Sequence, residues 1–382
     1  MRKIINYLQL NQVGGLELLF AFTPMLSGYG FMGYPLSLLL LPILLLMAMK
    51  KRTGTRYEVF KPVMILLIYV AVHDLVLVLS LGKNFFGYIN TLLYLVSILY
   101  ISPVLNLEKL KGSLNWACLV AIGGLLYQFT LVMAGQEVRP LDIPFLEMSE
   151  HRMEALTLRP SSFFMEPAAY TAFMFVPMAL ALIYRQYVWM GLLVFCVFLT
   201  GSTTGLLTSF IMIGVYALTQ GLKKRYILLM FAIGAVMFYS LGKFSIFETG
   251  VKKLQETDVE TNMRLAQGPY VVSTMEPGEY PFGVFYKGPY DYCLSRATNV
   301  HFYTEEVYMS TFWYMILVYG IVGLLLYLNV YWKLFRKSRL LLPLIVVLLA
   351  LLFSSGYSLG SAFMFTTISM LAVVYNKDAI EK

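Results

Sequence analysis

Apolar runs long enough to cross a lipid bilayer recur along most of this 382-residue chain. A helix needs about 20 mainly apolar residues to span roughly 30 Å of hydrocarbon. Hydrophobic residues make up 59% of the sequence and charged residues only 13%, which is too few to cover a soluble domain of this length. We therefore predict one all-α domain over residues 1–382, a polytopic integral membrane bundle of about 10–12 spans with two large extracytoplasmic loops. The expected spans cover residues 15–30, 32–49, 62–81, 85–105, 114–134, 166–184, 187–201, 203–221, 226–243, 307–332, 340–355 and 357–375.

Lysine and arginine cluster in three segments between the expected spans, and this placement predicts the orientation of the chain. The clusters lie at residues 50–56, 223–225 and 333–339, where few acidic residues accompany them. Because basic loops stay on the cytoplasmic side, both termini are predicted to be cytoplasmic. The net charge of +8 is then a topology signal, and it does not indicate a nucleic-acid partner.

Two long loops are expected on the outer side, at residues 135–165 and 244–306. Within the first, residues 145–158 alternate apolar and charged side chains, which predicts a short amphipathic helix on the outer membrane face. In the second, residues 253–267 are expected to be helical and residues 275–292 irregular. A bundle that only packs helices has no need of long outer loops rich in charged and aromatic residues, so we expect the functional site on this side.

Metal ligands are not evident in the sequence. Cys118 and Cys196 fall inside expected spans, Cys293 stands alone in the second outer loop, and no Cys/His spacing suggests a metal site. The acidic pair Asp258 and Glu260 is explained as well by a solvated helix face. The sequence therefore predicts neither a metal nor a cofactor.

The segment RPSSFFMEPAAY, residues 159–170, contains the most informative residues of the chain. Pro167 suits the first position of a helix, and Glu166 before it could cap free backbone N–H groups. That structural interpretation does not explain why Arg159 and Glu166 occur together at the mouth of a span. An arginine fork matches phosphate oxygens, and a helix N-terminus adds partial positive charge. This place could hold a diphosphate.

RPSSFFMEP resembles the Arg-x-x-Ser-x-Phe-x-Glu-Pro signature of Wzy-type O-antigen and capsule polymerases, within the O-antigen ligase/polymerase superfamily. LTGSTTGLL at 199–207 is similar to the Ser/Thr-rich span start of that superfamily. Arg264 followed by EYPFGVF at 279–285 resembles its large outer loop, and residues 308–328 resemble its last conserved helix. The His-Asn often found before that helix is absent here, and Asn299-Val300-His301 is the nearest match.

The resemblance implies a GT-C-like membrane fold and glycosyl transfer between polyprenyl-diphosphate-linked sugars on the outer face of a bacterial cytoplasmic membrane. It implies that Arg159 and Arg264 bind the diphosphate, with Arg296 a further cation; the alternative for each is a loop salt bridge. Glu166 would be the base or would orient an arginine, and His301 is a second candidate base. A chain-length regulator and a flippase are possible protein partners.

Two ionisable residues, His73 and Asp74, fall inside the third expected span, where such groups are uncommon and point to function. Neighbouring positions on a helix do not face each other, so we do not expect a simple pair. A structural interhelix hydrogen bond, support of the site from below, and a proton relay remain alternatives.

Three other functions compete with repeat-unit polymerisation. An O-antigen ligase would use the same donor chemistry but transfer the glycan to another acceptor. A flippase or transporter of lipid-linked oligosaccharide would need broken helices near the membrane midplane, whereas the unusual polar residues here concentrate in the outer loops. A cell-wall glycan polymerase would also use polyprenyl diphosphate, but its motifs are not evident.

Overall fold

The structure is a computed structural model that describes residues 2–51, 57–81, 86–148, 159–219, 263–284, 289–296, 309–355 and 359–376. These residues are mainly helical and contain one small β-sheet, so the prediction of an all-α membrane protein is confirmed at the level of a helical, apolar bundle. The elements are α1 Arg2–Tyr7, α2 Gly15–Phe22, β1 Tyr29–Phe31, β2 Tyr34–Pro35, α3 Leu36–Lys50, α4 Tyr57–Leu81, α5 Phe86–Ile101, η1 Ser102–Val104, α6 Leu107–Met133, β3 Glu147–Met148, α8 Pro167–Ile183, α9 Tyr187–Leu199, α10 Thr203–Thr219, α13 Met263–Ser273, α14 Pro289–Arg296, α15 Thr311–Lys337, η3 Arg339–Leu341, α16 Leu342–Ser354 and α17 Ser361–Tyr375.

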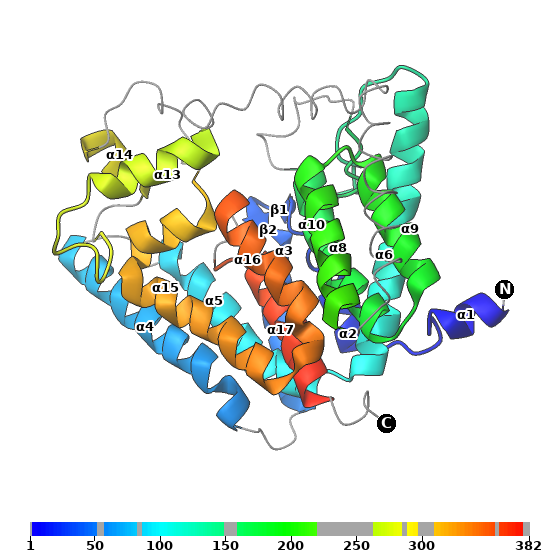
Figure 1. Ribbon diagram of the computed structural model, residues 1–382, viewed down its shortest axis with the longest axis horizontal. Coiled ribbons are helices and arrows are strands. Elements are labelled where there is room, and N and C mark those ends of the chain that lie inside the picture. Colours follow the sequence, from blue (N-terminus) through cyan, green and yellow to red (C-terminus); the bar gives the residue numbers. More distant parts are fainter. Residues whose placement is uncertain are drawn as a thin grey trace.

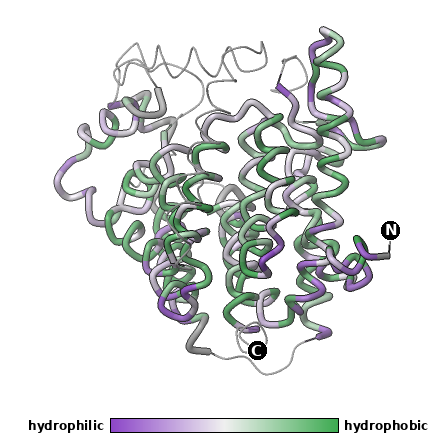
Figure 2. Tube along the Cα trace, turned by 45° about the vertical axis from the view of Figure 1, so that its right-hand side comes forward, coloured by the Kyte–Doolittle hydropathy of each residue, from purple (hydrophilic) through white to green (hydrophobic). Residues whose placement is uncertain are grey.

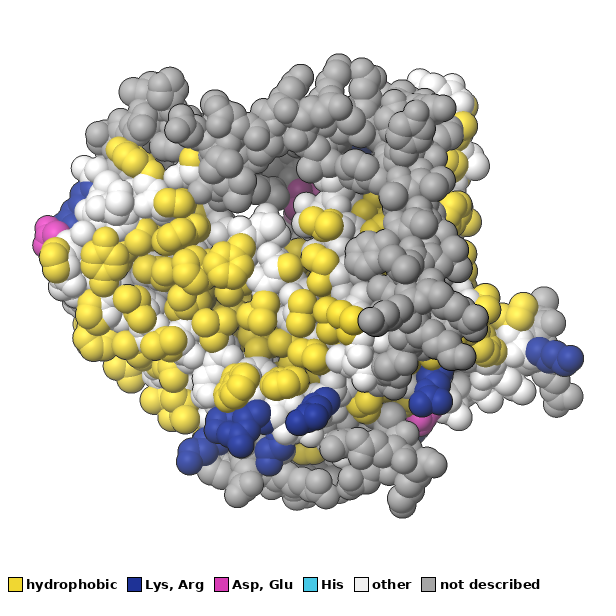
Figure 3. Space-filling model, in the orientation of Figure 1, with side chains coloured by type: hydrophobic (Ala, Val, Ile, Leu, Met, Phe, Trp, Pro, Cys, Tyr) yellow, Lys and Arg dark blue, Asp and Glu magenta, His cyan; other side chains and the backbone are white. Residues whose placement is uncertain are grey.

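Three helices within the described ranges, α4, α6 and α15, are long and apolar enough to cross a membrane. Shorter apolar helices, α3, α5, α8, α9, α10, α16 and α17, pack among them. Figure 2 shows hydrophobic residues along the bodies of the helices. Figure 3 shows a broad hydrophobic face with lysine and arginine side chains gathered below it. This is the pattern expected of a helical bundle embedded in lipid.

The helices form two neighbouring groups (Figure 1). One group packs α4 against α5 and α15, with α13 beside α15. The other packs α8 against α6, α9 and α10. The helices α16 and α17 join the groups, because α16 packs on both α10 and α15 and α17 packs on α5, α8 and α15. One continuous core of buried apolar side chains runs through both groups.

The expected first span, residues 15–30, is not one helix. The helix α2 ends at Phe22, and the chain turns through Pro24 into the β1–β2 hairpin. Met32 and Gly33 form the tip of this hairpin, both with positive φ (53° and 79°), as a two-residue turn between strands requires. Apolar composition predicted a span here, but proline and the glycines of this segment favour a turn and a hairpin.

The strand β3 pairs with β1, and this corrects the start of the predicted amphipathic helix. Glu147 pairs with Gly30 and Met148 with Tyr29, so residues 147–148 extend a three-stranded sheet of order β2-β1-β3. The backbone of β1 offers these residues sheet hydrogen bonds that a sequence reading of the loop alone cannot foresee. The remainder of the expected helix, residues 149–158, lies outside the described residues.

The helix α15 is broken at Gly320, where the backbone takes φ 67° and ψ −176°. The second outer loop fills the break: Val284 N donates to Leu317 O at 2.8 Å, and Ile321 N donates to Tyr280 O at 2.8 Å. Gly283 also has positive φ, 83°. A Cβ on either glycine would collide with the backbone of the other segment. The loop therefore supplies the backbone bonds that the broken helix loses.

The predictions for the second loop are partly confirmed. Residues 263–267 are helical, as the start of α13, while residues 253–262 lie outside the described part of the chain. Residues 275–282 form turns, as expected for an irregular stretch. The helix α14, however, begins at Pro289, inside the stretch predicted to be irregular. Pro suits the first turn of a helix, because that turn does not use its missing N–H.

Candidate active site

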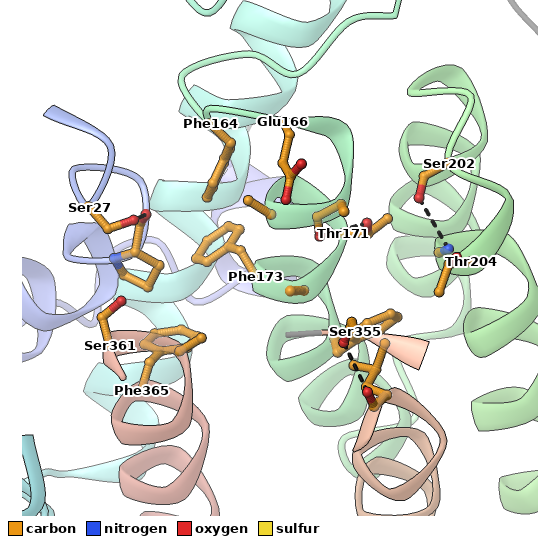
Figure 4. Close-up of a pocket in the computed structure, with 18 of the residues that line it drawn as sticks. Ser27, Phe164, Glu166, Thr171, Phe173, Ser202, Thr204, Ser355, Ser361 and Phe365 are labelled. Carbon is orange, nitrogen blue, oxygen red and sulfur yellow. Dashed lines mark hydrogen bonds between the residues drawn. The ribbon is translucent and has the colours of Figure 1, made fainter. Parts of the chain in front are cut away.

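A cavity of about 320 Å³ lies between α8, α10, α16, α17 and the turn that follows α2 (Figure 4). Its wall mixes hydroxyl side chains with aromatic rings, which is typical of a ligand site with a few orienting polar groups. The lining hydroxyl residues are Ser27, Thr171, Ser202, Thr204, Ser354, Ser355 and Ser361, the lining aromatic residues are Phe164, Phe173, Phe175 and Phe365, and the charged one is Glu166.

Glu166 stands at the mouth of this cavity and does not cap α8. Its backbone takes the extended conformation of an N-cap residue (φ −153°, ψ 157°), and Pro167 occupies the first helical position as predicted. The Glu166 side chain, however, makes no capping hydrogen bond, which contradicts the capping interpretation. Figure 4 shows it directed toward the cavity, above Thr171. A carboxylate placed in this way borders the space that a bound molecule would occupy.

Three helix N-termini meet at the cavity, because residues of the first turns of α8, α10 and α17 all line it. At α10, Ser202 Oγ accepts a hydrogen bond from Gly205 N at 3.2 Å, so this hydroxyl caps the helix. Helix N-termini carry partial positive charge and favour bound anions. The cavity thus combines one carboxylate with a positive electrostatic background supplied by the backbone.

Arg159 lies next to the same rim. Its Nη2 donates to Gly201 O at 3.2 Å, and Gly201 directly precedes the cavity-lining Ser202. Burial lowers the pKa of the Arg159 guanidinium, while the nearby Glu166 carboxylate acts in the opposite direction and raises it. The structure therefore brings the two predicted residues of the RPSSFFMEP segment within electrostatic reach of each other.

Gln128 of α6 fixes the segment that carries these residues. Its Oε1 accepts from Ser161 N (2.9 Å) and Ser162 N (2.6 Å), and its Nε2 donates to Arg139 O (2.6 Å) and Ser162 O (3.2 Å). The amide is almost fully buried, and these four bonds use all its hydrogen-bonding capacity. One turn earlier, Gly124 lets the segment approach, since a Cβ there would meet Ser162 Oγ.

Sequence reasoning did not identify Gln128. A single glutamine in an apolar run gives no sign of its hydrogen-bond partners. Here they are Arg139 and the pair Ser161 and Ser162, near opposite ends of the segment 135–165. The available signal was the combination of Gly124 and Gln128 on one face of the helix, four positions apart. Such a face lets a neighbouring backbone approach and then holds it.

The other predicted site residues do not join Glu166 in the described structure. Arg296 of α14 binds Glu279 through Nη1 at 3.0 Å and Glu276 through Nη2 at 3.2 Å, and does not line the cavity. Arg264 belongs to the first turn of α13, but its side chain lies outside the described part. His301 also falls outside it. The diphosphate-binding and catalytic roles of these three residues stay predictions.

His73 and Asp74 form a pair, contrary to the expectation from helix geometry. His73 Nδ1 lies 3.4 Å from Asp74 Oδ1, and both side chains are 2% exposed. The His73 ring also lies 5.1 Å from the Tyr319 ring, beside the break in α15. Side chains at adjacent positions can bend toward each other when burial removes competing water. The pair lies in the other helix group from the Glu166 cavity, and its function stays open.

Comparison with known proteins adds no family assignment. No protein-family model matches the chain, and no curated protein matches its sequence.

Proposed function

We propose that this chain is a glycosyltransferase that polymerises oligosaccharide repeat units carried on polyprenyl diphosphate. The observation that carries the proposal is the placement of Glu166, which begins α8 without capping it and instead lines a cavity. Arg159 stands beside this carboxylate, and three helix N-termini surround the cavity. The resemblance of RPSSFFMEP to the polymerase signature supports the same assignment.

The proposed reaction needs a base and a stabilised leaving group. The acceptor hydroxyl oxygen attacks the anomeric carbon of the donor sugar, and its proton passes to the Glu166 carboxylate. The bond from that carbon to the diphosphate oxygen breaks, and the diphosphate leaves with the electron pair. Arg159 and the helix N-termini stabilise the negative charge that develops there, with Arg264 as a further cation.

The proposal also sets the protein in its membrane. In this proposal the chain crosses the bacterial cytoplasmic membrane about 10–12 times, with both termini in the cytoplasm. The Glu166 cavity, the β-sheet and α13–α14 then face the outer side. The lipid tails of donor and acceptor lie among the helices, where apolar side chains such as Leu207 and Leu218 are exposed.

The test uses a deletion strain that carries wild-type, Arg159→Ala, Glu166→Gln or Arg264→Ala copies at equal membrane levels. The control is Glu137→Gln, which changes an exposed acid of the same outer loop. We expect surface glycan with a single repeat unit for the site variants and a normal ladder for the control. Long polymer that stays on its lipid carrier would identify a ligase. Repeat units that accumulate on the cytoplasmic side would identify a flippase.

A further inference from the structure

A second cavity, of about 490 Å³, adjoins the one that Glu166 lines. Its walls are the turn and hairpin of residues 27–35, the strand β3 and the side chain of Met165. Ser27 lines both cavities. Met165 lines the second, while its chain neighbours Phe164 and Glu166 line the first. The two spaces are therefore adjacent, with the Glu166 segment along their border.

The segment between the cavities carries a flexible side chain, Met165, which lines the second cavity. Met165 packs directly on Gly28, where a Cβ would collide with Cγ, Cε and Sδ of the methionine. A methionine is unbranched and flexible, so it can yield to a chain that passes from one cavity to the other. An extended ligand could in this way occupy both spaces at once.

The second cavity has the chemistry of a saccharide site. Tyr34 lines one wall of this cavity, and 65% of its surface is exposed. Glu147 stands on β3, on the far side of β1 from Tyr34, and Gly33 N donates to Glu147 Oε2 at 3.1 Å. A pyranose has apolar C–H faces that suit an aromatic ring, and edge hydroxyls that donate to a carboxylate. Among the described residues that line this cavity none is a lysine or arginine, so a diphosphate is a poor fit.

We infer that this second cavity binds the saccharide chain of a lipid-linked glycan. The sugars bound there are those that follow the sugar bound at Glu166. The inference rests on the proposed function. Tyr34 and Glu147 are binding residues for the chain, and Glu166 acts on the terminal sugar. Holding the sugars behind the reacting end keeps a growing chain bound between additions, so this cavity controls how long the polymer becomes.

The first test compares glycan ladders of Tyr34→Ala and Glu147→Gln with those of Tyr127→Ala, another exposed tyrosine that lines neither cavity. The Glu147→Gln amide oxygen can still accept from Gly33 N, so this change removes charge and keeps the turn. We expect polymer to persist but its modal length to fall at least twofold in both site variants, with Tyr127→Ala unchanged. Wild-type lengths in both variants at equal membrane levels would overturn the inference.

A binding measurement separates this inference from the proposed function. The probe is the set of oligosaccharides released by mild acid from the host's own surface glycan, titrated against purified full-length protein. We expect Tyr34→Ala to weaken binding at least fivefold and the control Tyr127→Ala to change it less than twofold. Equal binding by wild type and Tyr34→Ala would overturn the second site, even if Glu166→Gln abolishes polymer. Polymer made by Glu166→Gln would overturn the proposed function, whatever Tyr34 does.

Discussion

Two segments, 159–167 and 280–284, dock on the helix bundle by different means. The segment 159–167, which carries Arg159 and Glu166, is held mainly by one side chain, because Gln128 makes three hydrogen bonds to its backbone and a fourth to Arg139 O. The segment 280–284 is bound to α15 through backbone hydrogen bonds, where it enters the break at Gly320. A side-chain clamp can be weakened in steps by substitution. The contact between Gly283 and the break in α15 at Gly320 is a backbone interlock. Any side chain in place of either glycine would collide with the opposite backbone.

The largest effect is expected at the interlock. Gly320→Ala places a Cβ against Pro281 and imposes positive φ on an alanine, so we expect a loss of about 3 kcal/mol or more of unfolding free energy. The control is Gly123→Ala in α6, where a Cβ meets nothing within 4 Å. Thermal unfolding of the purified variants in detergent measures both. If Gly320→Ala unfolds at the wild-type temperature, the interlock does not hold the loop.

Gln128→Ala should have the next largest effect. It removes the side chain that binds the buried N–H groups of Ser161 and Ser162 and the carbonyl of Arg139, which costs about 2–4 kcal/mol in total; Ser162 O keeps its bond from Leu141 N. Gln128→Glu keeps an acceptor oxygen, and its protonated carboxyl can donate one hydrogen bond, so its loss should be smaller at a pH where the carboxyl is neutral. Polymer yield should fall in the same order as stability. Gln136→Ala, at an exposed position near the loop, is the control.

Tyr69→Phe tests the interlock more gently. The Tyr69 hydroxyl donates to Tyr319 O, a carbonyl beside the break in α15. Its removal should cost about 1 kcal/mol, because one buried acceptor loses its donor. Thermal unfolding again measures the change. A loss as large as that of Gly320→Ala would mean that side chains, and not the backbone, dominate this junction.

The smallest effect on stability is expected for Glu166→Gln. Glu166 makes no capping bond but attracts the Arg159 guanidinium, so its replacement by the neutral glutamine should lower the unfolding free energy by less than about 1 kcal/mol. Thermal unfolding of wild type and variant at equal detergent concentration provides the comparison. A decrease above about 2 kcal/mol would mean that the carboxylate holds the start of α8 in place.

Local sequence patterns predicted the features that depend on nearby residues. Apolar runs predicted helices that include α4, α6 and α15, and the Glu-Pro pair predicted where α8 begins. Composition could not distinguish a span from the hairpin after α2, because Tyr29–Pro35 is almost as apolar as its neighbours. The direction of the Glu166 side chain was equally hidden, since an N-cap and a cavity residue share the same sequence position.

Long-range contacts account for the rest. Gln128 binds residues 11 and 34 positions away in the chain, and Gly320 accommodates a loop that precedes it by nearly 40 positions. The Gly-Ile-x-Gly of α15 gives no local sign that the helix breaks there. The pairing of His73 with Asp74 depends on how α4 and α15 bury both side chains, and so could not follow from their spacing alone.

The central claim is that Glu166 is the base of a glycan polymerase. Its most direct test incubates the purified protein in detergent with lipid-linked repeat units extracted from the deletion strain, and follows product length by gel. We predict that wild type forms lipid-linked products of two and more units, and that Glu166→Gln, folded and equally stable, forms at least 100-fold fewer. Polymer formed by Glu166→Gln at the wild-type rate, or none formed by wild type, would contradict the claim.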